Sequence, residues 1–208
     1  MSEILRVARA ELSIEDPWIA PPQATPVRLV RSTDAAPPRL ATTVTVWYDP
    51  AHLNILFCGD DDAIVAKILE HDGPLYEEDV FEVFLAPGAL TTYFELEVNP
   101  LGTTFDARVE SPDGDRATMR VDRGWECAGL FAAVRKSWRG TTLTVDTMIR
   151  VPFASLGRTP PKRGEEWRAN FYRIDRGPLR DEFSAWRATM KTPADFHVPS
   201  AFGTLVFD

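Results

Sequence analysis

The chain has 208 residues, of which 44% are hydrophobic, 26% charged and 11% aromatic, and its formal net charge is −8. This composition fits one globular domain and excludes collagen, a coiled coil and a largely disordered chain. The excess of 31 Asp and Glu over 23 Lys and Arg, without a basic run, argues against nucleic acid or an anionic membrane as a partner.

The first half of the chain alternates between turn-rich and apolar segments. Residues 1–36 contain four prolines and predict a lead-in strand with loops that wrap the domain. Alternating apolar residues predict a strand over 43–48, and a run that is apolar on both parities predicts a fully buried strand over 52–58. For residues 59–77 two interpretations stay open, a short helix and an irregular loop.

Turn residues separate a further series of short alternating segments, and Arg139-Gly140 predicts the turn of a hairpin. A proline at its start favours a short helix over 152–156. We expect an all-β, antiparallel β-sandwich of the jelly-roll-like type, with a single domain over 1–208 and a few helical turns. The remaining predicted strands are 79–85, 92–99, 103–109, 129–138, 141–151, 167–174 and 202–207, with an additional short one at 183–186.

The ends and the cysteines bear on location and redox state. No basic segment followed by an apolar stretch opens the chain, and no run of about 18 apolar residues occurs. We therefore expect no signal peptide, no membrane span and a cytoplasmic location, with secretion as the alternative if a leader has been removed. Cys58 and Cys127 lie in apolar stretches and predict two buried free thiols. The expected oligomeric state is a monomer or a weak dimer.

An acidic cluster lies on two neighbouring predicted strands. Their apolar residues alternate onto one face, so the opposite face carries Glu82, Glu95 and Glu97. Like charges side by side cost stability unless a cation, an arginine or a ligand rich in hydroxyl groups binds them. Two interpretations stay open here: a solvated face neutralised by arginines such as Arg173, and a ligand site.

Aromatic residues flank this acidic cluster in the sequence. Tyr76 lies in the acidic loop before the first of the two strands, and Phe196 lies in a turn near the C-terminus. Proteins hold sugars by packing a planar ring on the apolar C–H face of the sugar while carboxylates accept hydrogen bonds from its hydroxyl groups. The combination predicts a shallow carbohydrate site.

A family resemblance supports this prediction. Residues 75–85, LYEEDVFEVFL, resemble the hallmark strand of carbohydrate-binding module family 9, and residues 93–102, YFELEVNPLG, resemble the strand that follows it. Four more segments resemble the family in order, so the likeness runs across nearly the whole chain. It implies an antiparallel β-sandwich that binds carbohydrate without catalysis, functions in polysaccharide catabolism and carries structural calcium. These segments are 145–153, 164–173, 184–186 and 196–205.

The resemblance also implies roles for individual residues. Family members hold a terminal sugar between two aromatic rings, and these positions fall on Tyr76 and Phe196, where sugar-binding members have tryptophan. The acid of the hallmark strand falls on Glu82, and Glu97 stands where those members use a basic residue. Trp186 and Arg173 complete the predicted set of ligand-binding residues, together with Glu95.

Two other functions remain alternatives. A glycosidase needs two carboxylates about 5–10 Å apart, and Glu82 with Glu95 or Glu97 could form such a pair. A haem or protein interaction domain of the same sandwich type would need an axial ligand such as His197 with Met119 or Met148.

Calcium is the metal ion that the acidic loops favour. Asp60 and Asp62 follow a predicted strand, and Asp79 ends the next acidic loop. Hard carboxylate oxygens at irregular spacing can surround Ca²⁺, although such loops are also found simply solvated. We therefore name these three residues as candidate ligands of a structural calcium ion and expect that no cofactor is required.

Overall fold

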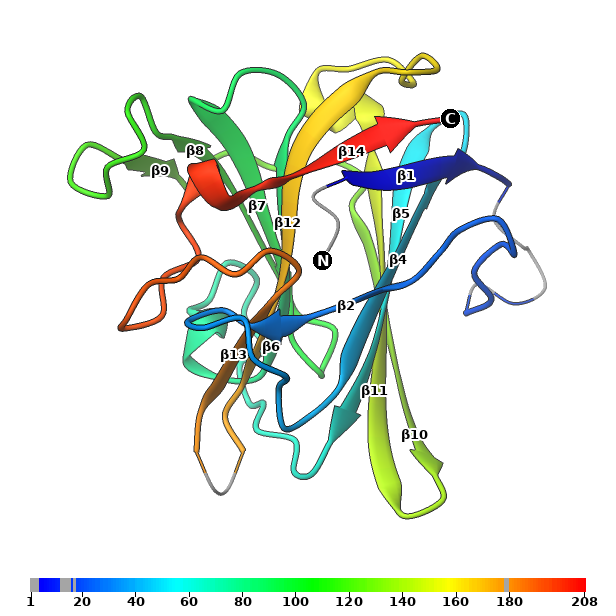
Figure 1. Cartoon of the computed structure of the whole chain (residues 1–208), viewed down its shortest axis with the longest axis vertical. Coiled ribbons are helices and arrows are strands. Elements are labelled where there is room, and N and C mark those ends of the chain that lie inside the picture. The colour runs from blue at the N-terminus through cyan, green and yellow to red at the C-terminus, as the bar shows by residue number, and fades with distance from the viewer. Residues whose placement is uncertain (1–3, 12–15, 17, 178–179) are drawn as a thin grey trace.

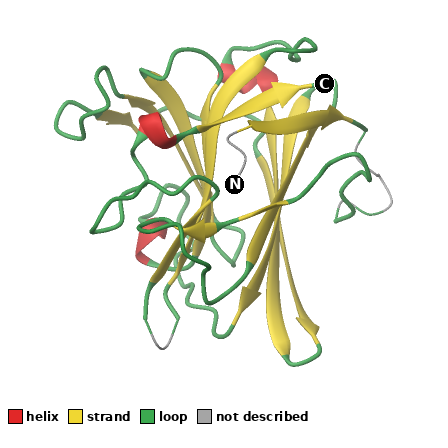
Figure 2. Cartoon of the chain, viewed as in Figure 1, coloured by secondary structure: helices red, strands yellow, loops and turns green. Residues whose placement is uncertain are grey.

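The computed structural model describes residues 4–11, 16, 18–177 and 180–208. The parts of the predicted lead-in segment at 1–3, 12–15 and 17 lie outside the described residues. Strands and loops make up almost all of the described chain (Figure 2). Its helical elements are single 3₁₀ turns: η1 (Leu75–Glu77), η2 (Phe153–Leu156) and η3 (Pro199–Ala201).

The first sheet is formed by antiparallel neighbours. The predicted hairpin around Gly140 is confirmed, since β10 and β11 pair along their whole length. In order across the sheet, the strands are β10 (Phe131–Arg139), β11 (Thr142–Pro152), β5 (His52–Asp61), β4 (Thr42–Tyr48) and the short β2 (Val27–Arg28).

The second sheet contains the strands that carry the acidic cluster. Its order is β14 (Gly203–Phe207), β12 (Glu166–Asp175), β6 (Val80–Ala86), β7 (Thr92–Val98), β8 (Thr104–Glu110) and β9 (Arg120–Asp122), again all antiparallel. The end of β12 pairs in addition with β13 (Glu182–Ala185), which pairs with β3 (Val30–Arg31). The additional strand predicted at 183–186 is therefore real, whereas β2, β3 and β9 had no clear signal in the sequence.

One strand, β1 (Ile4–Arg9), joins the two sheets. It runs parallel to β14 of one sheet and parallel to β4 of the other. Figure 1 shows β1 and β14 crossing one end of the molecule between the two sheets. The predicted antiparallel β-sandwich is thus confirmed, with these two parallel pairings as its exception.

Apolar side chains lie both between the sheets and outside one of them. The inner core contains Phe57, Val83, Leu96, Ile149 and Phe171 from strands of both sheets. A second apolar cluster covers the outer face of β6, β7 and β8 and includes side chains of the segments that follow β5 and β13. The outer face of this sheet is therefore roofed by loops, which creates the space for a site.

The segment at 59–77 and the cysteines can now be assigned. The helix alternative for 59–77 is wrong, because β5 continues to Asp61 and the described segment ends in the single turn η1. Cys58 and Cys127 are free, and burial raises the pKa of both thiols to about 12, as expected of unreactive cysteines. No helix in the described ranges is long and apolar enough to cross a membrane.

Candidate functional site

The alternation of β6 and β7 positions the acidic cluster. As predicted, Phe81, Val83 and Leu85 of β6 face the inner core, so the residues between them point to the outer face. The antiparallel register places Glu82 directly opposite Glu97, and Phe84 opposite Glu95. Three carboxylates therefore meet on one face of two adjacent strands, with one oxygen of each lying within 4.8 Å of the others.

This outer face is not the solvated surface that a polar strand face usually presents. The exposed fractions of Glu82, Glu95 and Glu97 are only 2%, 6% and 2%. Loops from distant parts of the chain cover the strands and leave a cleft of about 400 Å³ over the carboxylates, which we call the acidic cleft. It is lined by Tyr76, Glu82, Glu95, Glu97, Phe105, Arg116, Met119, Val121, Arg123, Ile174, Arg176, Phe183, Ala194, Asp195, Phe196 and His197.

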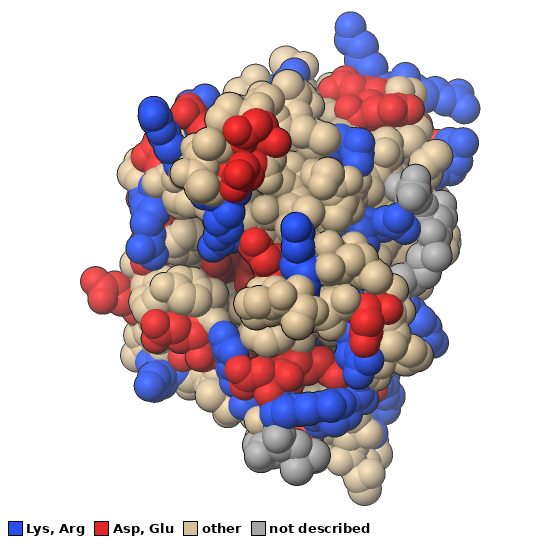
Figure 3. Space-filling view, turned by 60° about the vertical axis from the view of Figure 1, so that its left-hand side comes forward, with Lys and Arg blue, Asp and Glu red and all other residues tan. Residues whose placement is uncertain are grey.

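Charge is distributed in depth within the acidic cleft. The carboxylates form its floor, while Arg116, Arg123 and Arg176 stand nearer the surface. Figure 3 shows this side of the molecule, where acidic atoms lie deep in a hollow and basic side chains stand at its edge. The arginines have partners of their own: Arg116 pairs with Asp195 at 2.8 Å, and Arg176 pairs with Asp181.

Burial and mutual repulsion hold protons on the carboxylates. Burial, and secondly the charge of Glu95, raise the pKa of Glu82 well above its ordinary value. Burial raises the pKa of Glu95 to about 7, against a hydrogen bond with Glu97 that lowers it. The pKa of Glu97 is raised well above normal by burial and by both neighbouring carboxylates. The interaction between the two side chains lowers the pKa of Glu95 and raises that of Glu97, which makes Glu97 the donor of this hydrogen bond and Glu95 the acceptor.

A histidine closes one side of the cluster. His197 Nε2 lies 3.6 Å from Glu95 Oε1, and His197 Nδ1 is hydrogen-bonded to the Tyr93 hydroxyl at 2.7 Å. Burial lowers the pKa of His197 to about 4, so the ring is neutral near pH 7. His197 thus lies beside Glu95 as a neutral ring that brings no counter-charge to the cluster.

The two predicted aromatic platforms differ in how they are held. The Tyr76 side chain is 49% exposed at the mouth of the acidic cleft, with a face free for contact. Phe196 also lines the cleft but is only 7% exposed, and its ring stacks on Tyr172 at 4.2 Å between centroids. Of the two rings, Tyr76 is the one available to a ligand, whereas Phe196 is largely committed to packing.

Two predicted ligand contacts lie elsewhere in the molecule. Arg173 is buried on the opposite face of β12, where its guanidinium donates to Asp61 at 3.0 Å and to Asp175 at 2.8 Å. Trp186 is 1% exposed in the inner core, packed on Phe171. Neither side chain lines the acidic cleft, because alternation turns Arg173 inward and Trp186 follows β13 into the core.

The three predicted calcium ligands do not converge. Asp60 pairs with Arg139, and Asp62 pairs with Arg39. Asp79 accepts hydrogen bonds from the backbone N–H groups of Val65 and Arg176, at 2.6 and 2.7 Å. Each of the three carboxylates thus has a separate protein partner, and calcium binding by these residues stays a prediction.

A different acidic group forms nearby from Asp61, Asp62 and Asp175. Arg173 binds Asp61 and Asp175, and Arg39 binds Asp62 and Asp175. Two guanidinium groups thus offset most of the charge of three carboxylates.

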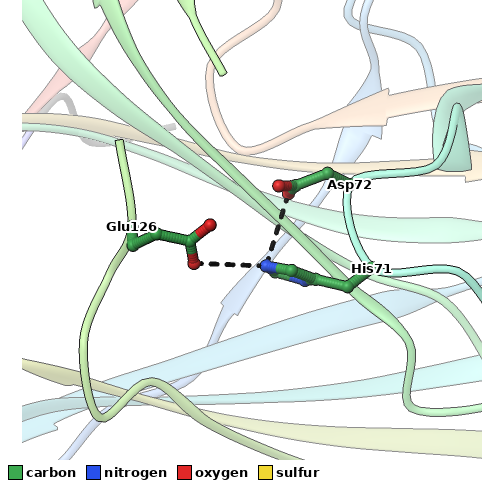
Figure 4. Close-up of side chains that lie close together, drawn as sticks. All are labelled: His71, Asp72 and Glu126. Atoms are coloured by element: carbon green, nitrogen blue, oxygen red, sulfur yellow. Dashed lines mark hydrogen bonds and ion pairs between the residues drawn. The ribbon is translucent and has the colours of Figure 1, made fainter. Parts of the chain in front are cut away.

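A surface group of His71, Asp72 and Glu126 is the third place where metal-ligating side chains meet (Figure 4). His71 Nε2 lies 3.3 Å from Glu126 Oε2 and 3.6 Å from Asp72 Oδ1. Partial burial lowers the pKa of His71, but hydrogen bonds with the Thr104 carbonyl and with Glu126 outweigh it and raise the pKa overall. A protonated imidazole that pairs with two carboxylates accounts for this arrangement.

Several cleft residues had not been foreseen. Phe105 could have been found, because alternation in the strand 103–109 puts it on the face of Glu97, and the two are register partners. Arg116 and Met119 come from the loop before β9, and Val121 from β9 itself, where the sequence has no such pattern. Met148, one of the methionines considered for haem, is fully buried in a separate apolar cluster.

The proton load of the acidic cleft predicts how stability depends on pH. Folded Glu95 keeps its proton up to about pH 7, whereas an unfolded glutamate loses it near pH 4.3, so its contribution to stability should fall as pH rises from about 4.3 to 7 and stay level above that. The slope is at most about 1.4 kcal/mol per pH unit for each proton. His197, whose folded pKa is about 4, contributes a slope of the opposite sign below about pH 6.5, because the unfolded ring binds a proton there.

Urea unfolding at several pH values checks this expectation. Between about pH 4.5 and 7 the stability of the unmodified protein should decline relative to that of the variant Glu95→Gln. His71 and His197 titrate in both proteins, so their contributions cancel in the comparison. Equal slopes in the two proteins would contradict the assignment of the proton to this cluster.

Comparisons with known proteins agree with one another. The model of the family described as carbohydrate-binding family 9 matches residues 41–207. A relative from Arthroderma benhamiae, named an extracellular protein, is 24% identical over 185 residues, which is 80% of this chain and 78% of the relative.

Solved structures share the fold at low sequence identity. A Bacteroides uniformis protein to which carbohydrate binding has been attributed has a TM-score of 0.75 at 16% identity, with both chains fully covered. A family 9 module from Caldicellulosiruptor kristjanssonii in complex with cellotriose has a TM-score of 0.63 at 13% identity, covering 99% of this chain and 93% of the module. A glucose complex of a module from the same organism has a TM-score of 0.60, also at 13% identity, covering 99% and 95%.

Proposed function

Because the chain belongs to carbohydrate-binding family 9, we propose that it binds carbohydrate non-catalytically in the acidic cleft, as a step in polysaccharide catabolism. One observation carries the proposal: a half-exposed aromatic ring, Tyr76, and a floor of buried carboxylates line the same cleft of about 400 Å³. This volume is within the usual range for small-molecule sites, about 300–1,000 Å³.

The apolar part of the acidic cleft would contact the C–H face of a sugar ring. Tyr76 at the mouth offers a planar face, and Phe105, Ile174 and Phe196 make the wall below it apolar. Aromatic packing of this kind contributes about 0.5–1.5 kcal/mol beyond the area it buries. Because few such contacts oppose the cost of ordering a mobile ligand, we expect modest affinity.

The floor would select the arrangement of polar groups on the sugar. One oxygen of Glu97, Oε2, is buried and has no hydrogen-bond partner among the described residues. A buried acceptor without a donor lowers stability. A ligand hydroxyl group that donates to Glu97 Oε2 should therefore contribute more binding free energy than a hydroxyl group that finds no such acceptor. The complexes of relatives with cellotriose and glucose support a glucose-type ring as the first ligand to test.

The geometry of the carboxylates supports binding rather than glycoside hydrolysis. A glycosidase places its two carboxyl groups on either side of the scissile bond, about 5–10 Å apart. Glu82, Glu95 and Glu97 instead share one floor, with oxygens within 4.8 Å of one another. Aryl-glycosides should therefore not be turned over, and activity that is lost in Glu82→Gln would favour the enzyme alternative.

Isothermal titration with glucose, cellotriose and larger oligosaccharides tests the proposal. We expect saturable binding with a dissociation constant between about 1 μM and 1 mM. The exposed tryptophan of β10 supplies a matched control: Trp138→Ala should bind as the unmodified protein does, since Trp138 lies outside the acidic cleft. A lack of binding to every sugar, up to high millimolar concentration, would contradict the proposal.

A further inference from the structure

The floor of the acidic cleft holds more carboxyl groups than a neutral sugar needs. Glu82, Glu95 and Glu97 are buried within 4.8 Å of one another, and no Lys or Arg of the described residues forms an ion pair with any of them. Two other acidic groups of this chain are neutralised by arginine or by histidine. This one has the neutral His197 beside it, at 3.6 Å from Glu95, while Arg116, Arg123 and Arg176 lie farther out in the same cleft.

The missing partner is indicated by a specific atom. Glu97 Oε2 is buried and has no hydrogen-bond partner among the described residues. A buried carboxylate normally requires a hydrogen-bond donor or a counter-charge beside it. The unpartnered oxygen therefore marks where a donor that carries positive charge would lie.

An ammonium group fits this floor better than a hydroxyl group does. An ammonium has three N–H donors, one for each carboxylate, whereas a hydroxyl has a single donor. Hydrogen bonds between ionised partners are also roughly twice as strong as those between neutral ones. A protonated amine that enters the floor would displace the protons held there, so that the ionised carboxylates match it in number and in sign of charge.

The rest of the acidic cleft argues for an amine on a sugar rather than for a bare metal ion. A metal ion alone would leave unused a space of about 400 Å³ with apolar walls such as Phe105 and Ile174. The arginines nearer the surface do not compete for the floor. Arg116 is paired with Asp195, and Arg123 donates to the Asp72 carbonyl at 2.9 Å while its guanidinium lies over Phe105.

We infer that the acidic cleft selects an amino sugar with a free amine, and that its ammonium group lies among Glu82, Glu95 and Glu97. The inference rests on the proposed function, since it specifies the chemistry of the sugar held there. A free 2-amino-2-deoxyhexose is the smallest probe of this chemistry, and glucosamine is the one to use.

Titration calorimetry at about pH 6.5, where a sugar amine is protonated, compares four probes: glucosamine, N-acetylglucosamine, glucose and calcium chloride. Glucosamine should bind at least about tenfold more tightly than glucose or N-acetylglucosamine, because it is the only one of the three sugars that carries a positive charge. Glu97→Gln keeps the shape of the side chain and should abolish this preference. The exposed Glu166 gives the matched control Glu166→Gln, which should retain the preference.

Each other outcome overturns the inference in a recognisable way. Equal binding of glucose and glucosamine would reject the ammonium site while the proposed carbohydrate function stands. Binding of no sugar at all would reject both. Calcium binding that Glu97→Gln removes, without any preference for glucosamine, would show that the floor is a metal site. The probe comparison uses the unmodified protein, so it remains decisive even if a variant fails to fold.

Discussion

Replacing Tyr76 with alanine should lower the affinity for carbohydrate by about 10- to 100-fold, which takes modest binding below detection. Tyr76 is the half-exposed ring at the mouth of the acidic cleft, and its main-chain carbonyl, which accepts from Arg176, is kept in the variant. The loss should come from the missing stacking surface rather than from a rearranged loop. Calorimetric titration of both proteins with the same sugar measures it.

The melting temperature separates this loss from unfolding. Because the Tyr76 side chain is 49% exposed, Tyr76→Ala should change stability by less than about 1 kcal/mol. Tyr76→Trp, which restores the ring found in sugar-binding members of the family, should bind at least as well as the unmodified chain. If Tyr76→Ala bound the sugar with unchanged affinity, the Tyr76 ring would not be part of the binding site.

Phe196 does not provide an equivalent test. Its ring stacks on Tyr172 and belongs to the apolar cluster on the outer face of the second sheet. A buried phenylalanine that is cut back to alanine typically costs about 3–5 kcal/mol, so a loss of binding in Phe196→Ala would be mixed with a loss of folding. The paired use of two rings that the resemblance implies is therefore tested at Tyr76.

Arg173→Met should destabilise the fold by about 3–5 kcal/mol. The guanidinium of Arg173 is buried and donates to Asp61 and Asp175. It also donates to the Thr42 hydroxyl and the Asp60 carbonyl, so it joins β12 to strands of the other sheet. Methionine fills a similar volume but leaves two buried carboxylates with a single remaining guanidinium, that of Arg39.

Urea unfolding measures this effect against a matched surface change. Arg108 on β8 is 44% exposed in its side chain and pairs with Glu110 at 3.6 Å, so Arg108→Met should cost no more than about 1 kcal/mol. Equal losses in the two variants would show that the buried network of Arg173 contributes no more than a surface ion pair. Folded Arg173→Met should still bind sugar, since Arg173 does not line the acidic cleft.

Alternation along the strands predicted the faces of β6 and β7 from the sequence. Apolar residues at every second position can only share the core, which puts Glu82, Glu95 and Glu97 together on the other face. The family resemblance added the place of Tyr76 in the loop before β6. These parts of the candidate site depend on the order of residues within short segments, which can be recognised directly in a sequence.

The burial of the acidic cluster could not be read in the same way. The cover over β6 and β7 comes from loops that carry Met119 and His197, and their position depends on long-range packing rather than on periodicity. A strand face of glutamates therefore looked solvated and its site shallow, whereas the loops convert it into a cleft.

The two misplaced contacts, Arg173 and Trp186, have different physical origins. Arg173 required the register of β12 against β6, in which Tyr172 rather than Arg173 shares the outer face with Glu82. Trp186 follows β13, and its ring packs so closely on Gly203 that a Cβ there would lie 2.4 Å from it. A parity argument would have excluded Arg173 once the register was known, whereas no sequence signal marked the glycine as the partner of Trp186.

The partners of the acidic loops could not be found from the sequence. Acidic loops are assigned a cation when no counter-charge is visible nearby in sequence, but Arg39 and Arg173 approach Asp61, Asp62 and Asp175 from distant segments. The planar donors of these guanidinium groups supply positive charge to the three carboxylates. The same reasoning makes the floor of the acidic cleft distinctive, since no such arginine reaches it among the described residues.

The measurement that tests the central claim most directly is an amide NMR titration of the unmodified protein with glucosamine and with cellotriose. Binding in the acidic cleft predicts saturable shifts of signals from its lining, such as Tyr76, Glu97 and His197, and unchanged signals from Trp138 on the opposite sheet. Saturable shifts centred elsewhere, or no shifts with any sugar, would contradict the account.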